Sequence, residues 1–185
     1  EVSAFIEEAL FATMTNVNFD VETMLELVLE CGRINLKVMQ LLNDGHIERF
    51  GQPVPTEVYE GTRPGPGILV TGHDMSDLEN VLKQTEGTGV NVYTHGEMLP
   101  AHSYPELRKY KHLAGHFGDA WQKQKKEFAQ FSGPVLATTN CILIPTEHYA
   151  DRVFTTRVTA VPGGTRIKDD DFSSLIEKAL ACEPL

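Results

Sequence analysis

Short apolar runs that alternate with helix-like segments constrain the fold of this chain more than any other feature of its sequence. The runs are Ile68–Thr71, Val90–Thr94, Val135–Thr139 and Val153–Thr156. Continuous apolar runs of this length indicate strands that are buried on both faces of a sheet. Because strands and helices alternate through short connections, the pattern predicts an α/β fold built on a parallel, doubly wound sheet.

Three segments between and after these strands are predicted to be helical. The first opens with a capping-box sequence at Ser76 and extends to Gln84. The second covers Ala120–Phe131, and the third covers Phe172–Ala181.

The first fifty residues are predicted to be helical as well. Asp20 is a candidate N-cap, and Asn43-Asp44-Gly45 is expected to end the long helix that begins there. Apolar residues at helical spacing predict one buried face on this helix. That face comprises Val21, Met24, Leu25, Val28, Leu29, Leu36, Met39 and Leu42. Cys31 lies inside the same helix and is interpreted as a small core residue.

Prolines and glycines alternate between Gly51 and Gly67, and this shift in composition marks the best candidate boundary. The predicted organisation is a helical segment over residues 1–50, a Pro/Gly linker over 51–67 and an α/β domain over 68–185.

The charge and composition exclude several classes of function. The formal net charge is −10, from 26 acidic and 16 basic residues, so the chain repels nucleic-acid phosphates and no nucleic-acid partner is expected. No apolar stretch approaches the roughly 20 residues that a membrane helix needs, and the acidic start does not resemble a signal peptide. Three scattered cysteines are too few for a disulfide framework, which favours a reducing, cytoplasmic location.

Metal-competent side chains follow three of the predicted strands. His73 comes after the first strand, Glu97 after the second and Cys141 after the third. Because the carboxyl ends of parallel strands meet at one edge of a sheet, these side chains are expected to converge there. Iron in a mixed sulfur and oxygen environment accepts thiolate, imidazole and carboxylate, and zinc accepts them too, whereas calcium and magnesium prefer oxygen-rich shells.

Other interpretations of the same residues stay open. A single Cys, His or Glu after a strand is more often an ordinary buried or surface residue, so the chain could be a metal-free α/β scaffold. His95, Glu97 and His102 lie close in sequence and could form the zinc site of a hydrolase, although their spacing matches no helical zinc motif. Cys141 could also act as a nucleophile with His73 or His95 as its base.

The chain contains three long strings that are more specific than any short motif. They are GHDMSDLENVLKQTEGTGVNVYTHGEMLPAHSYPELRKY, HFGDAWQKQKKEF and GPVLATTNCI. Together with LELVLECGRINLKVMQLL, DRVFTT and FSSLIEKAL, they resemble the hybrid cluster protein family, which are prismane-type iron–sulfur oxidoreductases. The resemblance implies an N-terminal helical domain and two Rossmann-like domains, a conventional iron–sulfur cluster and a hybrid iron–sulfur–oxygen cluster. It also implies reduction of hydroxylamine to ammonia and of nitric oxide to nitrous oxide.

The resemblance implies roles for individual residues. By motif match, the histidine of GHD, the glutamate of THGEMLP and the cysteine of TTNCI are hybrid-cluster ligands, and here these are His73, Glu97 and Cys141. Glu97 and His73 are also candidate catalytic proton donors. Glu86 and His95 are expected to support the ligands from nearby.

The other ligands of both clusters lie in motifs that this chain does not contain. We therefore expect it to be the end of the helical domain and the middle domain of a longer parent, with its cluster incomplete or absent and no activity alone. The expected partners are the remaining domains of the parent, hydroxylamine or nitric oxide as a small-molecule substrate, and a redox electron donor. Without those domains, the apolar face of the long helix is expected to be exposed and to drive self-association.

Overall fold

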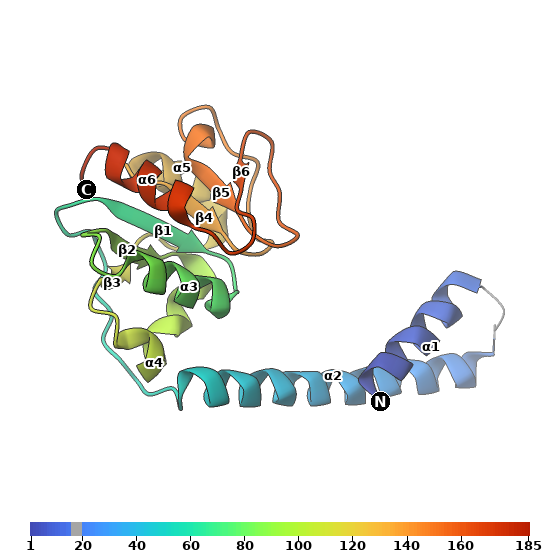
Figure 1. Cartoon of the computed structure of the whole chain (residues 1–185). Coiled ribbons are helices and arrows are strands. Elements are labelled where there is room, and N and C mark those ends of the chain that lie inside the picture. Colours follow the sequence, from blue (N-terminus) through green and yellow to red (C-terminus); the bar gives the residue numbers. More distant parts are fainter. Residues whose placement is uncertain (16–19) are drawn as a thin grey trace. The chain divides into compact units, whose positions relative to one another are not determined.

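Figure 1 shows the computed structural model, which describes residues 1–15 and 20–185. In this described part the chain forms two compact units, Glu1–Gly51 and Gln52–Leu185. The three-part organisation expected from the sequence stays a prediction, and residues 16–19 of its helical segment lie outside the described residues.

The first unit consists of α1 (Val2–Thr15) and α2 (Val21–Phe50). Asp20 is the N-cap of α2, as predicted, and its side chain accepts a hydrogen bond from the N–H of Thr23 at 2.9 Å. The predicted end of α2 at Asn43-Asp44-Gly45 is wrong, because the helix continues to Phe50 and ends at Gly51, which has φ +84°. A glycine inside a helix costs only about 1 kcal/mol relative to alanine, so Gly45 does not have to end the helix.

The apolar face of α2 is exposed, so the prediction of a buried face is wrong for this chain. Val28 and Leu29 are 65% and 66% exposed, and Cys31 is exposed rather than a core residue. Helix α1 covers only part of α2, where Phe5 and Ile34 are buried. The exposure agrees with the expectation that this face is uncovered when the remaining domains of the parent are missing. Self-association through this face stays a prediction.

The second unit is built on a parallel sheet, which confirms the predicted fold class. Its strands within the described residues are β1 (Gly67–Thr71), β2 (Asn91–Thr94), β3 (Leu113–His116), β4 (Val135–Ala137), β5 (Val153–Thr155) and β6 (Thr165–Arg166). Their order is β3-β2-β1-β4-β5-β6, and each neighbouring pair is parallel. The order reverses between β1 and β4, and a crevice at such a switch point is where α/β sheets bind ligands.

Helices cover both faces of this sheet. They are α3 (Met75–Thr85), α4 (Pro105–Arg108), α5 (Gln124–Gln130) and α6 (Ser173–Ala181), together with the 3₁₀ helices η1 (Gly96–Ser103), η2 (Trp121–Lys123) and η3 (Ala150–Arg152). Figure 1 shows α3 and α6 in front of the sheet and α5 behind it. None of the described helices is both long and apolar enough to cross a bilayer.

The start of α3 differs from the sequence prediction. Its N-cap is Asp74, whose carboxylate accepts hydrogen bonds from the N–H groups of Ser76 and Asp77 at 2.8 and 3.0 Å. The helix therefore begins at Met75, one residue before the serine of the predicted capping box, and the carboxylate of Asp74 satisfies N–H groups of its first turn. This cap directly follows His73 and fixes the path of the chain after that residue.

The core holds the central strands rigidly. Leu69 of β1 and Val135 of β4 are fully buried in one cluster with Phe128 of α5 and Phe131. Ile68 and Val70, which alternate with Leu69, are fully buried on the other face. The predicted burial of both faces is confirmed for β1, β4 and β5, and the ends of β1 and β4 are therefore fixed relative to each other.

Candidate metal centre

His73, Glu97 and Cys141 lie together at the carboxyl edge of the sheet. His73 occupies the turn between β1 and α3, Glu97 lies in η1 after β2, and Cys141 lies in the loop after β4. One ligand atom from each residue lies within 4.8 Å of the other two. Strands β2, β1 and β4 are neighbours in the sheet, so the arrangement follows from the strand order and the switch point.

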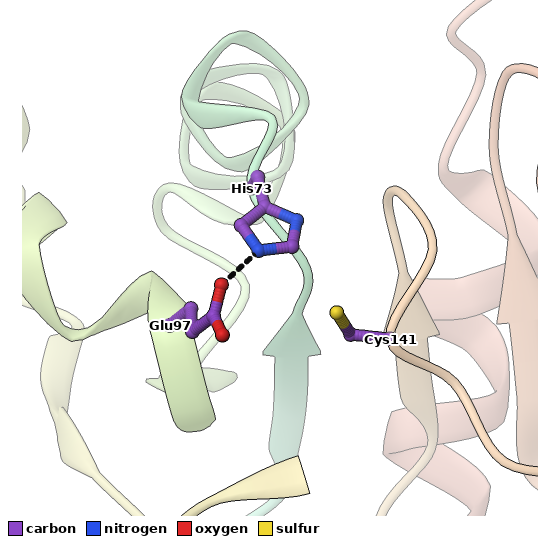
Figure 2. A group of neighbouring side chains, drawn as sticks. All are labelled: His73, Glu97 and Cys141. Atoms are coloured by element: carbon purple, nitrogen blue, oxygen red, sulfur yellow. Dashed lines mark hydrogen bonds and ion pairs between the residues drawn. The ribbon is translucent and has the colours of Figure 1, made fainter.

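The imidazole of His73 is held at both nitrogens. Its Nε2 is bonded to a carboxylate oxygen of Glu97, and its Nδ1 lies 2.7 Å from the hydroxyl of Thr139 (Figure 2 shows the contact with Glu97). Thr139 stands two residues before Cys141, so this bond also ties the His73 turn to the Cys141 loop. The side chains of His73 and Glu97 are 38% and 61% exposed, so both can be reached from solvent.

Close backbone contacts join the β1 and β4 loops. The N–H of Thr138 donates to the carbonyl of Thr71 at 3.0 Å, and the N–H of Asp74 donates to the hydroxyl of Thr138 at 3.2 Å. Gly72 has φ +104°, and a Cβ there would lie 2.5 Å from Thr138 Oγ1. Glycine is therefore required where the two loops meet.

Cys141 has a strained backbone, with φ +63°. A residue with a Cβ in this left-handed region costs about 1–3 kcal/mol, and such residues concentrate at functional sites. The thiol is partly buried and, among the described residues, is paired in no disulfide.

The zinc site considered for His95, Glu97 and His102 is not formed. His95 is fully buried and bonds Thr71 Oγ1 at 3.1 Å and Glu127 at 2.9 Å. His102 bonds Thr94 Oγ1 at 2.8 Å. Burial lowers the pKa of His95, and it lowers the pKa of His102 to about 4. Both rings are therefore neutral structural groups, and His73, Glu97 and Cys141 are the one metal-competent group in the described part of the chain.

The hypothesis that Cys141 is a nucleophile requires His73 or His95 as its base. The ring nitrogens of His73 bond Glu97 and Thr139, and those of His95 bond Thr71 and Glu127. Each ring nitrogen of these two imidazoles therefore has a hydrogen-bond partner other than the thiol, whereas a thiol–imidazole pair requires a hydrogen bond between the two groups.

Residues around the site include some that sequence reasoning did not identify. Thr139, Glu127 and Gln124 all form hydrogen bonds with the site or with its supports. They lie within the strings GPVLATTNCI and HFGDAWQKQKKEF, but the sequence analysis assigned none of them a role. His95 forms a hydrogen bond with Thr71 at the end of β1, and Glu86 is exposed at the end of α3, so the supporting roles of both stay predictions.

A cavity of about 560 Å³ opens beside Glu97. Its lining includes Glu60, His116, Asp119 and Trp121. The cavity is large enough for a small molecule to approach the carboxylate from the side of η2.

Known proteins are similar to this sequence along nearly its whole length. The sequence profile of the Prismane/CO dehydrogenase family matches residues 1–185. The chain is 60% identical over 185 residues to a hydroxylamine reductase of Moorella thermoacetica, which covers all of this chain and 43% of that protein. It is 55% identical over 179 residues to a hydroxylamine reductase of Thermotoga maritima, covering 97% of this chain and 42% of that protein.

A third relative also matches the whole of this chain. The hydroxylamine reductase of Methanothermobacter thermautotrophicus is 51% identical over 185 residues, covering all of this chain and 43% of that protein. The chain thus spans less than half the length of these curated relatives. On the match over its full length, the chain belongs to the Prismane/CO dehydrogenase family.

Proposed function

We propose that this chain is a segment of an iron–sulfur oxidoreductase that reduces hydroxylamine to ammonia at a hybrid iron–sulfur–oxygen cluster. In this proposal His73, Glu97 and Cys141 supply part of the ligand cage. The supporting observation is that an imidazole, a carboxylate and a thiol lie within 4.8 Å of one another in a member of this family. Its relatives are named hydroxylamine reductase.

The donor set fits such a cluster. Thiolate is a soft ligand, carboxylate is hard and imidazole is intermediate, and iron that is bridged by both sulfur and oxygen accepts all of them. Glu97 is 61% exposed and His73 is 38% exposed, so groups from the rest of the parent could complete the cage from the open side. Alone, the chain holds a partial cage, and we expect it to be inactive.

The chemistry needs electrons and protons in equal number. Reduction of hydroxylamine consumes two electrons and two protons, breaks the N–O bond, and yields ammonia and water. The cluster, when bound, supplies the electrons and a site for the nitrogen or oxygen of the substrate. The hydrogen-bonded pair of Glu97 and His73 stands where a proton can be held and passed to the leaving oxygen.

Other residues of the chain orient this pair. Thr139 fixes the ring of His73 through Nδ1, and the cavity beside Glu97 gives the substrate a path to the carboxylate. Reduction of two nitric oxide molecules to nitrous oxide and water uses the same numbers of electrons and protons, and we propose it as a second reaction of the same centre. A conventional cluster elsewhere in the parent and an external redox donor would deliver the electrons.

We further propose a cytoplasmic location. Cys31, Cys141 and Cys182 form no disulfide with one another, and a thiolate that ligates iron must stay reduced.

The test uses the complete parent protein, purified without oxygen. Glu97→Gln removes the negative charge and proton-transfer capacity of the carboxylate, and we expect ammonia production from hydroxylamine to fall by about 100-fold or more. Glu106→Gln is the matched control, because Glu106 is an exposed carboxylate of α4 that bonds only Lys109 in the described structure.

Iron content and the visible absorption spectrum are measured beside the rate. Cys141→Ser is expected to lower the iron content and weaken the charge-transfer absorption. Full cluster content together with full turnover in Glu97→Gln would show that the ligand assignment is wrong.

A further inference from the structure

The loop that holds Cys141 lies outside the sheet. Strand β4 ends at Ala137, and residues 138–149 form neither helix nor strand. Within this loop Cys141 adopts a left-handed backbone conformation, with φ +63°. Because residues with a Cβ rarely adopt that conformation, contacts from other elements must stabilise it.

One buried side chain forms hydrogen bonds with the backbone of this loop on both sides of Ile142. Gln124, the first residue of α5, is 1% exposed. Its Nε2 donates to the carbonyl oxygen of Cys141, and its Oε1 accepts from the N–H of Leu143 at 3.0 Å. A carboxamide offers a donor and an acceptor in one plane, so a single side chain fixes the peptide groups at both ends of the segment.

Helix α5 is a firm support for this contact. Phe128, one turn after Gln124, is fully buried in the core cluster that contains Leu69 and Val135. Ile142 packs against the same cluster. The loop is therefore attached to the core by an apolar side chain and to α5 by the carboxamide, and the carboxamide bonds Cys141 itself.

We propose that Gln124 is a positioning residue, which holds the Cys141 loop in the conformation that directs the thiol toward His73 and Glu97. The inference rests on the proposed function, since it takes Cys141 to be a cluster ligand. Figure 2 shows the sulfur on the side of the loop that faces the other two residues. Without the bonds from Gln124, Cys141 can leave the left-handed region, and its sulfur would then move away from the other two ligand atoms.

The experiment uses the complete parent protein with its clusters, purified without oxygen. Gln124→Met preserves the volume and flexibility of the side chain and removes both hydrogen bonds. Gln122→Met is the matched control, because Gln122 is exposed and lies in the preceding 3₁₀ turn. Cys141→Ser removes the thiol itself. The measurements are the rate of iron release to a chelator, the electron paramagnetic resonance spectrum at a fixed potential, and the melting temperature.

We expect Gln124→Met to release iron about 10-fold faster or more, and to change the resonance spectrum, while Gln122→Met behaves as the unmodified protein. If Cys141→Ser changes the spectrum and the release rate but Gln124→Met changes neither, the positioning role is wrong and the proposed function stands. If Cys141→Ser changes neither, the proposed function is wrong, and the inference is wrong with it.

A second variant covers the case in which Gln124→Met lowers the melting temperature. Gln124→Glu keeps the acceptor for Leu143, and its ionised carboxylate lacks the donor to Cys141, so the spectrum is recorded at a pH at which the introduced carboxyl is ionised. A changed spectrum at an unchanged melting temperature supports the inference, and an unchanged spectrum overturns it.

Discussion

Adding one methyl group at Gly72 is expected to separate the two loops that meet at the candidate metal centre. Gly72 precedes His73 and has φ +104°. A Cβ there would lie 2.5 Å from Thr138 Oγ1 and 2.8 Å from the backbone nitrogen of Thr139. Both atoms belong to the loop that leads to Cys141. The hydroxyl of Thr138 can rotate away from the added methyl group, but the backbone nitrogen of Thr139 cannot, so Gly72→Ala must displace backbone.

The expected loss of stability has two sources, which are the strained backbone of an alanine at this position and the displacement of packed atoms. Backbone strain contributes about 1–3 kcal/mol, and displacement of packed atoms adds about 1–3 kcal/mol, so the free energy of unfolding falls by about 4 kcal/mol. For a chain of this length about 1 kcal/mol lowers the melting temperature by roughly 2–4 °C, which gives a decrease of about 8–16 °C. Urea unfolding and thermal melting, both followed by circular dichroism, measure these quantities.

Gly87→Ala separates the strain from the steric effect. Gly87 has φ +76°, and a Cβ there would meet no atom within 4 Å, so this variant incurs only the strain of about 1–2 kcal/mol. Equal losses of stability in Gly72→Ala and Gly87→Ala would refute the reasoning, because they would show that the β1 and β4 loops do not approach as closely as described.

Two further outcomes are expected from single substitutions. Thr139→Val keeps the shape of the side chain but removes the hydroxyl 2.7 Å from His73 Nδ1, so hydroxylamine reduction by the complete parent should fall about 10-fold or more, whereas Thr165→Val on the exposed strand β6 should leave it unchanged. His102→Gln should make the free energy of unfolding less sensitive to acid. Burial lowers the pKa of His102 to about 4, whereas the pKa in the unfolded chain is about 6.5. The contribution of neutral His102 to stability is therefore complete above about pH 6.5 and is lost as the pH falls through about 4. This pKa shift corresponds to about 3 kcal/mol in the free energy of unfolding, which urea unfolding at pH 7 and pH 4 measures. If the variant loses as much stability between these two pH values as the unmodified chain, the prediction is wrong.

The sequence predicts those strands that consist of buried apolar residues, because their apolar runs can be recognised. The strands β1, β2, β4 and β5 are apolar runs and were predicted to within two residues at each end. The strand β3 was missed because it contains Gly115, which weakens the strand pattern, although the backbone of Tyr59 lies too close for any Cβ at that position. The strand β6 was missed because it is two residues long and exposed, so no apolar pattern marks it.

The same distinction applies to the candidate metal centre. Residues that follow directly after buried strands can be located from sequence, because the end of each strand fixes their positions, and His73, Glu97 and Cys141 belong to this class. The residues that orient them cannot be located in this way. Gln124 reaches Cys141 from a helix 17 residues earlier in the chain, and its role depends on how α5 packs against the sheet.

The exposure of the candidate ligands bears on how the centre could work. Expelling water from an active site strengthens the electrostatic interactions inside it, including those that direct proton transfer. The side chain of Glu97 is 61% exposed, so this chain by itself does not provide that exclusion at the carboxylate. Under the proposed function, we therefore expect the remaining part of the parent to cover Glu97 as well as to supply ligands. Protection of Glu97 from modification by a water-soluble carbodiimide in the parent, compared with the chain alone, would distinguish such a cover from a centre that stays open to solvent.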